Sequence, residues 1–353
     1  MMERIVIRSS NWLGDAVMSV PAVRAIKRGL DGAHVAVLTP EKLADVWRLV
    51  PEVDEVIAFP AAKGSGLIRT LTGMAHIFRV AKLIRGRGFT TGVVFPNSLR
   101  TALEMWLARV PKRVGYPGHA RRSVLMTQVF REEKAERATA PGRHQVHHYL
   151  GLAEFLGARV EPDASFGFPN AGSPHTRAPG TPARIAVCAG AEYGPAKRWP
   201  PEHFAEVVQA VSDSAACRWQ LVGMAKDRPV AAEIATLCEN PANVENLCGE
   251  TTLAQLIAIL RESDALLSND TGTMHLAALL GVRTVAIFGS TEPALTGPLG
   301  CGHIIVRKHA ECSPCFLREC PIDFRCMREI ETTTVVAAVR EAIGKVRVQS
   351  VKS

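Results

Sequence analysis

The sequence predicts an α/β protein of two doubly wound domains. Three observations support this prediction. Short runs of β-branched and aliphatic residues alternate with amphipathic segments, the pattern of buried parallel strands joined by helices. A proline- and glycine-rich stretch at residues 166–183 interrupts this alternation, which then begins again. The length of 353 residues suits two domains of about 150–180 residues each.

In the first half, apolar runs bounded by polar residues predict four strands. Between them, Val17, Val20, Val23, Ile26 and Leu30 recur at helical spacing and predict a helix over residues 16–30. A longer helix is expected over residues 67–85. The predicted strands are 4–8, 34–38, 55–59 and 91–95.

The second half repeats the pattern with five expected strands: 184–189, 219–222, 244–247, 265–268 and 284–288. The intervening helices are expected to begin near residues 201, 227 and 273 and to span 252–262. We therefore predict a first domain over 1–165, a linker over 166–183, a second domain over 184–332 and a C-terminal helix and tail over 333–353. Ligands of such sheets bind at the carboxyl ends of the strands, which predicts a site facing a central cleft.

The net charge of +8 is concentrated in the first half of the chain. Residues 1–170 contain 24 Lys and Arg against 15 Asp and Glu, a net of +9, whereas residues 171–353 contain 18 against 19. A basic half suggests an anionic partner, either a membrane surface or a phosphorylated substrate, with general solubility as the alternative. The 20 aromatic residues do not interleave with the basic ones, so no nucleic-acid partner is expected.

The sequence shows no export or membrane-spanning signal, which predicts a cytoplasmic protein. No apolar run approaches the ~20 residues that span a bilayer, and the N-terminus lacks a basic segment followed by an apolar one. The odd number of cysteines, nine, favours reduced thiols.

The first strand is followed by a segment that contains several polar residues, Ser9-Ser10-Asn11-Trp12-Leu13-Gly14-Asp15. Asp15 is expected near a helix start, where it either acts on a ligand or only caps the helix. The GxGxxG fingerprint of dinucleotide-binding proteins is absent here.

The second domain opens with a glycine-rich loop at residues 188–200, followed by a proline-initiated helix. Lys197 and Arg198 in this loop suit an anion that also meets free backbone amides, or they are simply solvated. The P-loop pattern GxxxxGK[ST] is missing.

A cluster of polar residues at 268–275 lies between an apolar strand and an Ala/Leu-rich helix. Asp270, Thr271 and Thr273 can cap that helix, and amides and hydroxyls of this kind also suit a phosphate. Capping explains two of these residues but not six, so this segment is interpreted as functional.

Four segments together resemble the lipopolysaccharide heptosyltransferases of glycosyltransferase family 9, and the resemblance covers nearly the whole chain. They are NWLGDAVMSVPAVRA (11–25), GAEYGPAKRWPPEHFAE (190–206), SNDTGTMHLAALLGVRTVAIFGSTEP (268–293) and CSPCFLRECPIDFRCM (312–327). The resemblance implies the GT-B fold and inverting transfer of L-glycero-D-manno-heptose from ADP-heptose, in Gram-negative lipopolysaccharide core synthesis. It favours the first heptose of heptosyl-Kdo2-lipid A as acceptor. The alternatives are another core position or, as a different class, another nucleotide-binding protein with two Rossmann-like domains.

The resemblance also assigns roles to residues. Asp15 matches the catalytic base and Lys197 the lysine on the ADP phosphates, so no cofactor is required. Asn11, Arg121 and Arg122 are candidate acceptor-binding residues. The donor-binding candidates are Glu192, Tyr193, Lys197, Gly249, Thr251, Asp270, Thr271, Gly272, Thr273 and His275.

Two further expectations concern the surface and a metal. Arg69, Arg79, Lys82, Arg85 and Arg87, on or just after the helix predicted at 67–85, are expected to meet acceptor phosphates or the inner face of the inner membrane, or else to form a solvated helix face. The C-terminal helix, over 333–346, is expected to pack back across the domains. Cys312, Cys315, Cys320 and Cys326 are a possible structural metal site, although their spacing is not that of a paired CxxC zinc site.

Overall fold

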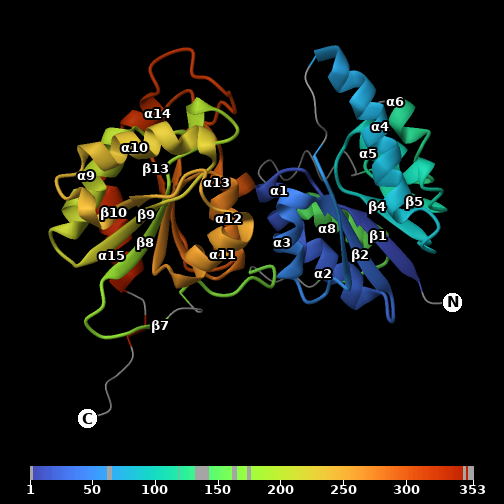
Figure 1. Ribbon diagram of the computed structural model, residues 1–353, viewed down its shortest axis with the longest axis horizontal. Coiled ribbons are helices and arrows are strands. Elements are labelled where there is room, and N and C mark those ends of the chain that lie inside the picture. Colours follow the sequence, from blue (N-terminus) through green and yellow to red (C-terminus); the bar gives the residue numbers. More distant parts are fainter. Residues whose placement is uncertain are drawn as a thin grey trace, which may run out of the picture. The chain divides into compact units, whose positions relative to one another are not determined.

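The computed structural model (Figure 1) describes residues 3–61, 66–118, 120–131, 143–160, 165–172, 176–344 and 347–348. The chain divides into two compact units, Met1–Pro162 and Asp163–Ser353. The two units are described one at a time.

The first unit is built on a six-stranded parallel sheet with the strand order β3-β2-β1-β4-β5-β6. Strand β1 lies at its centre, with Val6 opposite Ala36 of β2 and Gly92 of β4. The residues after β1 therefore emerge in the middle of the carboxyl edge, where α/β sheets bind ligands. The strands are β1 (Arg4–Arg8), β2 (His34–Pro40), β3 (Glu55–Phe59), β4 (Thr91–Val94), β5 (Lys112–Gly115) and β6 (Gln128–Val129).

Helices cover both faces of this sheet (Figure 1). The buried side chains of α4 and α5 form a core with the sheet that includes Val80, Ile84 and Met105. The helices of the unit are α1 (Leu13–Met18), α2 (Val20–Gly29), α3 (Ala44–Arg48), α4 (Gly66–Ile84), α5 (Leu99–Leu107), α6 (Ala120–Ser123) and α8 (Val146–Phe155), with a 3₁₀ turn, η1 (Glu41–Leu43).

The helix predicted at residues 16–30 is two helices, so that prediction is wrong in its limits. Helix α1 ends at Met18 and α2 begins at Val20. Pro21 lies in the first turn of α2, and it has no N–H to donate to a carbonyl of the preceding turn. The break leaves Asp15 in the first turn of the six-residue helix α1.

The second unit repeats the architecture with the parallel strand order β10-β9-β8-β11-β12-β13. Strands β8 and β11 are central neighbours, with Val187 opposite Leu267, so the loops after them emerge side by side. The strands are β8 (Ala183–Cys188), β9 (Cys217–Leu221), β10 (Val244–Asn246), β11 (Ala265–Asn269), β12 (Arg283–Phe288) and β13 (Ile304–Arg307).

The helices of this unit are α9 (Pro201–Ser212), α10 (Arg228–Leu237), α11 (Leu253–Glu262), α12 (Gly272–Leu279), α13 (Pro293–Thr296), α14 (Arg325–Arg328) and α15 (Thr332–Gly344), with 3₁₀ turns η2 (Pro195–Lys197), η3 (Ala225–Asp227) and η4 (Pro241–Asn243). Buried side chains of α9, α10, α14 and α15 form one core with the sheet that includes Phe204 and Trp219, and Met274 of α12 packs in a separate cluster with Ala286 and Phe288.

The C-terminal helix α15 packs against α9 and β12 of the second unit, and Val335 and Val339 belong to that unit's core. Within the predicted linker, β7 (Thr176–Arg177) pairs in parallel with β14 (Arg347–Val348). The expectation that the C-terminal helix packs back across the domains stays a prediction.

The predicted fold class, α/β with two doubly wound parallel sheets, is confirmed. The helices and strands absent from the prediction are α3, α5, α6, α8, β5 and β6 of the first unit and α13, α14, β7, β13 and β14 of the second. In the described part of the chain, no helix is long and apolar enough to cross a membrane.

Candidate functional site

The site in the second unit centres on an ion pair between two predicted donor-binding residues. Lys197 Nζ lies 2.5 Å from Asp270 Oδ2, and the two side chains are 14% and 4% exposed. Thr291, which follows β12, donates its hydroxyl to the same carboxylate oxygen at 2.7 Å. Three loops at the carboxyl edge, after β8, β11 and β12, thus meet at one carboxylate.

The segment after β11 leads directly into helix α12, and no side-chain hydrogen bond caps that helix in the described part of the chain. Thr271 is the N-cap of α12, Gly272 is its first residue, and Thr273 and His275 are buried in its opening turns. Side chains within α12 are therefore held by the core, while its first amides remain at the sheet edge. Backbone amides at a helix N-terminus favour a negatively charged group such as a phosphate.

Buried Asn269 locks the loops after β8 and β11 together. Its amide nitrogen donates to the Ala189 carbonyl at 2.7 Å, and its oxygen accepts the Trp199 backbone N–H at 3.1 Å. Because the Trp199 side chain is itself 1% exposed, this bridge fixes the loop carrying Lys197 to the loop carrying Asp270.

The glycines of the loop after β8 allow close approach of other groups. A Cβ at Gly190 would lie 2.3 Å from the carboxyl carbon of Asp227, and one at Gly194 would lie 2.3 Å from the Arg318 carbonyl oxygen. That carbonyl accepts the Ala196 N–H at 3.0 Å. The cysteine-rich segment containing Arg318 thereby supports the turn that presents Lys197.

Two cations flank the aromatic ring of Tyr193. Lys197 Nζ lies 5.0 Å and the Arg318 guanidinium 5.2 Å from the ring centroid, distances at which cation–π attraction operates. The Tyr193 hydroxyl donates to the Phe316 carbonyl at 2.8 Å. Lysine, arginine and helix amides together make this edge of the second unit suited to a diphosphate.

The other predicted donor-binding residues lie elsewhere along the same edge. Gly249 and Thr251 follow β10, the outermost strand, and Gly249 has a positive φ of 79° beside the backbone of Ala225. Glu192 is exposed in the loop after β8. Their predicted roles stay predictions.

In the first unit, Asp15 accepts a hydrogen bond that the sequence did not suggest. The Tyr149 hydroxyl donates to Asp15 Oδ1 at 2.9 Å. Burial, and after it the charge of Asp15, raises the pKa of Tyr149 well above its usual value, so the phenol remains a donor. Trp12 and not Asp15 is the N-cap of α1, so Asp15 does not cap that helix.

Asn11 is held by a buried ion pair at the end of β1. Arg8 donates to Glu104 Oε2 at 2.7 Å and to Asn11 Oδ1 at 3.1 Å, and both charged side chains are fully buried. Burial lowers the pKa of Arg8, and the Glu104 carboxylate opposes that shift. The pair orients the amide of Asn11 rigidly beside the start of α1.

The two candidate acceptor-binding arginines differ in exposure. Arg121 is exposed, whereas Arg122 is 1% exposed and donates to the Pro96 carbonyl at 3.3 Å. Its Nε and Nη1 atoms are buried and have no hydrogen-bond partner among the residues that the structure describes. Burial lowers the pKa of Arg122.

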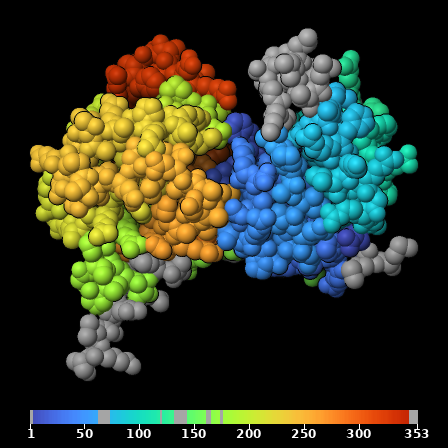
Figure 2. All heavy atoms as spheres, viewed as in Figure 1, coloured from blue at the N-terminus to red at the C-terminus, as the bar shows by residue number. Residues whose placement is uncertain are grey.

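The possible metal at the four cysteines of the segment 312–326 stays a prediction. Within the described residues, which include all four, no three His, Cys, Asp or Glu side chains are placed to hold one metal ion. Burial, followed by the charges of the other three cysteines, raises the pKa of Cys326 to about 11. The segment, in red at one end of the second unit in Figure 2, is fixed by protein contacts: Ser313 donates to the Gly289 carbonyl and Phe316 to that of Ser290.

Sequence reasoning missed Tyr149, Thr291, Arg318 and the Arg8–Glu104 pair. Thr291 stands within the recognised segment 268–293 and Arg318 within 312–327, so a signal existed for both. Tyr149 and Glu104 lie on helices that were not predicted, and no motif marks either residue.

The fold and the site geometry define a class: a two-unit, Rossmann-like α/β protein whose second unit has a sheet edge suited to an anion. Comparison with known proteins identifies the family. The model of glycosyltransferase family 9 (heptosyltransferase) matches residues 77–324. The chain belongs to this family and is a glycosyltransferase.

Relatives and solved structures agree with this assignment. The chain is 29% identical to lipopolysaccharide heptosyltransferase 2 of Escherichia coli K12, covering 86% of this chain and 88% of the relative. It is 25% identical to lipopolysaccharide heptosyltransferase 1 of Pseudomonas aeruginosa over 90% and 87%. The fold matches the structure of E. coli ADP-heptose LPS heptosyltransferase II with a TM-score of 0.76, at 24% identity over 97% and 99%. A family 9 glycosyltransferase structure from Veillonella parvula matches with a TM-score of 0.79, at 21% identity over 97% of both chains.

Proposed function

We propose that the chain transfers L-glycero-D-manno-heptose from ADP-heptose to the first heptose of heptosyl-Kdo2-lipid A. The observation that carries this proposal is its similarity, over 86% of its length, to proteins named heptosyltransferase 2 from several bacteria. Addition of heptose to the lipopolysaccharide inner core agrees with the family. The acceptor carries anionic groups, which suits a first half with a net charge of +9.

The donor half of the reaction belongs to the second unit. Lys197 supplies positive charge for the diphosphate, and the amides at the start of α12 supply oriented dipoles. Since Lys197 is paired with Asp270 at 2.5 Å, a bound diphosphate must share the ammonium with this carboxylate or take it over. The Lys197 ammonium and the amides at the start of α12 both stabilise the negative charge that develops as ADP leaves.

The acceptor half belongs to the first unit. Asp15 accepts the proton of the acceptor hydroxyl while that oxygen bonds to the anomeric carbon of the heptose. The bond from the anomeric carbon to the β-phosphate oxygen breaks, ADP leaves with the electron pair, and attack from the opposite face inverts the configuration. The proton balance closes on Asp15 and requires no metal ion or cofactor.

The proposed localisation is cytoplasmic, with the protein bound peripherally to the inner face of the inner membrane. Helix α4 buries Ile77, Val80, Ala81 and Ile84 and exposes Met74 and Phe78. Arg79, Lys82, Arg85 and Arg87 are exposed on or just after the same helix, while the side chain of Arg69 lies outside the described part. Exposed apolar side chains among cations suit an anionic lipid surface.

The decisive assay supplies purified protein with ADP-heptose and defined acceptors that carry zero, one or two heptoses. Turnover restricted to the one-heptose acceptor supports the proposal. Preference for zero heptoses, or for two, assigns the chain to another core position. In a parallel measurement, ADP should raise the melting temperature and NAD should not. Stabilisation by NAD alone would favour the rival class of nucleotide-binding protein.

A structural metal at the four cysteines is tested separately. We expect substoichiometric metal by elemental analysis and unchanged stability with a chelator. One tightly held zinc or iron per chain, lost together with stability on chelation, would overturn this expectation.

A further inference from the structure

We propose that Tyr149 is a positioning residue for the transfer reaction: its hydroxyl holds the Asp15 carboxylate in the orientation that accepts the acceptor proton. The proposal rests on the base assignment made above for Asp15. Tyr149 matches none of the segments that suggested the family, and it lies 134 residues from Asp15 in the sequence.

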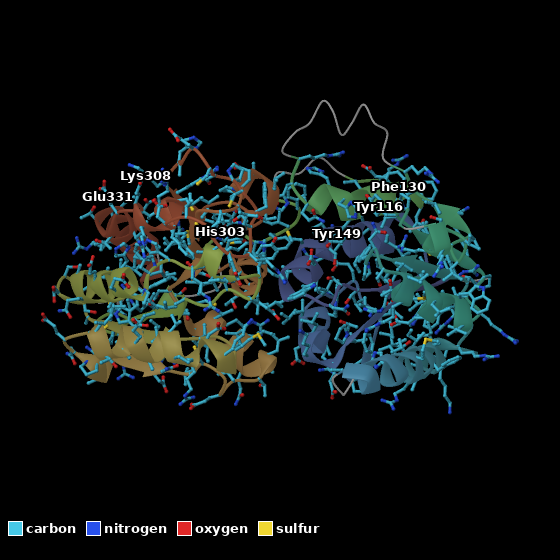
Figure 3. The ribbon with its side chains drawn as sticks, turned by 90° about the horizontal axis from the view of Figure 1, so that it is seen from above. Tyr116, Phe130, Tyr149, His303, Lys308 and Glu331 are labelled. Carbon is cyan, nitrogen blue, oxygen red and sulfur yellow. The ribbon has the colours of Figure 1, made fainter. Side chains whose placement is uncertain are left out.

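The position of the Tyr149 hydroxyl is determined by packing. The residue lies on α8, which packs against α2, the helix that directly follows α1. Its side chain is buried, at 4% exposed, and its ring meets that of Phe95 edge to face with centroids 5.2 Å apart. Figure 3 shows Tyr149 on the first unit, beside Tyr116 and Phe130. A ring held on its faces has little freedom, so its hydroxyl stays at one point.

The chemistry of the contact suits orientation and not proton transfer. A phenol of raised pKa remains protonated throughout the working pH range and donates one hydrogen bond. That bond engages Asp15 Oδ1 at 2.9 Å and so restrains the direction in which the carboxylate points. A hydrogen bond donated to a carboxylate also favours its charged form, the form that can accept a proton.

Several ionisable groups on the described elements around Tyr149 have contacts of their own. On α2, Arg24 and Arg28 pair with Glu52 and Lys27 pairs with Asp54. On α8, His148 stacks on Tyr116 with centroids 3.6 Å apart, and burial lowers the pKa of His147. At the end of β1, Arg8 pairs with Glu104.

The chain offers a matched control in Tyr116. This tyrosine is equally buried, at 1% exposed, and belongs to the same unit. Its hydroxyl donates to the backbone carbonyl of His148 on α8 and not to Asp15. Tyr116→Phe therefore removes a buried hydroxyl next to the same helix without touching the base.

The experiment compares Tyr149→Phe, Tyr116→Phe and the wild type in kcat, in KM for ADP-heptose and in the pH profile of kcat/KM. For Tyr149→Phe we expect kcat to fall about ten- to hundredfold, the value of a hydrogen bond to a charged group. The KM for ADP-heptose should stay within about twofold, and the acid limb should move up by about one pH unit. Tyr116→Phe should leave the acid limb in place.

Each outcome decides one point. An unmoved acid limb with wild-type kcat in folded Tyr149→Phe overturns the proposal. An equal loss of kcat in both variants, without a shift of the limb, assigns Tyr149 a purely structural role and also overturns it. Asp15→Asn measured alongside separates this result from the proposed function: if that variant retains turnover, the base assignment itself fails.

Discussion

The pairing of Lys197 with Asp270 makes the role of the lysine testable by a double-mutant cycle. If Lys197 binds the diphosphate, Lys197→Met should weaken ADP binding about ten- to hundredfold, the value of a charged hydrogen bond. It should lower kcat/KM for ADP-heptose by about 10²–10³, as for a lost transition-state donor. If Lys197 only neutralises Asp270, both losses should disappear once Asp270 no longer carries a charge.

The stability of the variants follows from the geometry. The ion pair has an Nζ–Oδ2 distance of 2.5 Å and side chains that are 14% and 4% exposed, so Lys197→Met leaves a buried carboxylate without its cation. We expect the free energy of unfolding to fall by about 3 kcal/mol, which is the low end of the range for a broken buried ion pair. The low end applies because the Thr291 hydroxyl still donates a hydrogen bond to Asp270. Adding Asp270→Asn removes the uncompensated charge and should restore most of that loss.

The assay measures ADP affinity by calorimetry and kcat/KM for four proteins: wild type, Lys197→Met, Asp270→Asn and the double variant. Lys308→Met, which removes an exposed lysine of the same unit, is the matched control (Figure 3). A direct phosphate contact predicts a clear fold-loss on removing Lys197 in both Asp270 backgrounds, with a difference between the two losses that measures the coupling of the ion pair. If the loss vanishes in the Asp270→Asn background, the direct contact is refuted.

Three further predictions follow from single positions. Asp15→Asn keeps an acceptor for the Tyr149 hydroxyl but not a base, so kcat should fall about 10²–10⁴-fold with ADP affinity intact; near-normal turnover would remove Asp15 from the chemistry. Burial lowers the pKa of His303 from 6.5 to about 4. Between pH 6.5 and pH 4, His303 therefore binds a proton in the unfolded chain but not in the folded one, so the free energy of unfolding decreases as the pH falls. The wild type should therefore lose about 2–3 kcal/mol more than His303→Gln between pH 7 and pH 4.5 in urea unfolding, and parallel losses would contradict this. Gly194→Ala places a methyl 2.3 Å from the Arg318 carbonyl, so the turn bearing Lys197 must shift, with a stability loss of about 1–3 kcal/mol and a higher KM for ADP-heptose; an unchanged KM would show that the turn is not held by this contact.

Much of the fold could be predicted because its signals are local. Runs such as RIVIR (4–8) and HVAVL (34–38) fall on strands because a parallel strand buried on both faces must be largely apolar along its length. Helices and strands of mixed polar and apolar composition were not predicted. Helix α5 carries buried Glu104 beside apolar residues, and strand β5 begins Lys112-Arg113, so neither shows a clear periodicity.

The sequence by itself determined which residue types stand at the carboxyl edge of each sheet. Asp15 and Lys197 lie within a few residues of the ends of apolar strands, and the segment 268–275 begins at the end of another, so the direction of a parallel strand brings all three to that edge. Only the tertiary structure decided their partners. The bonds from Tyr149 to Asp15 and from Lys197 to Asp270 span 134 and 73 residues, and Arg122, a surface cation by composition, is buried. Such contacts depend on strand order and on how each helix packs against its neighbours, and no local pattern of side chains specifies either one.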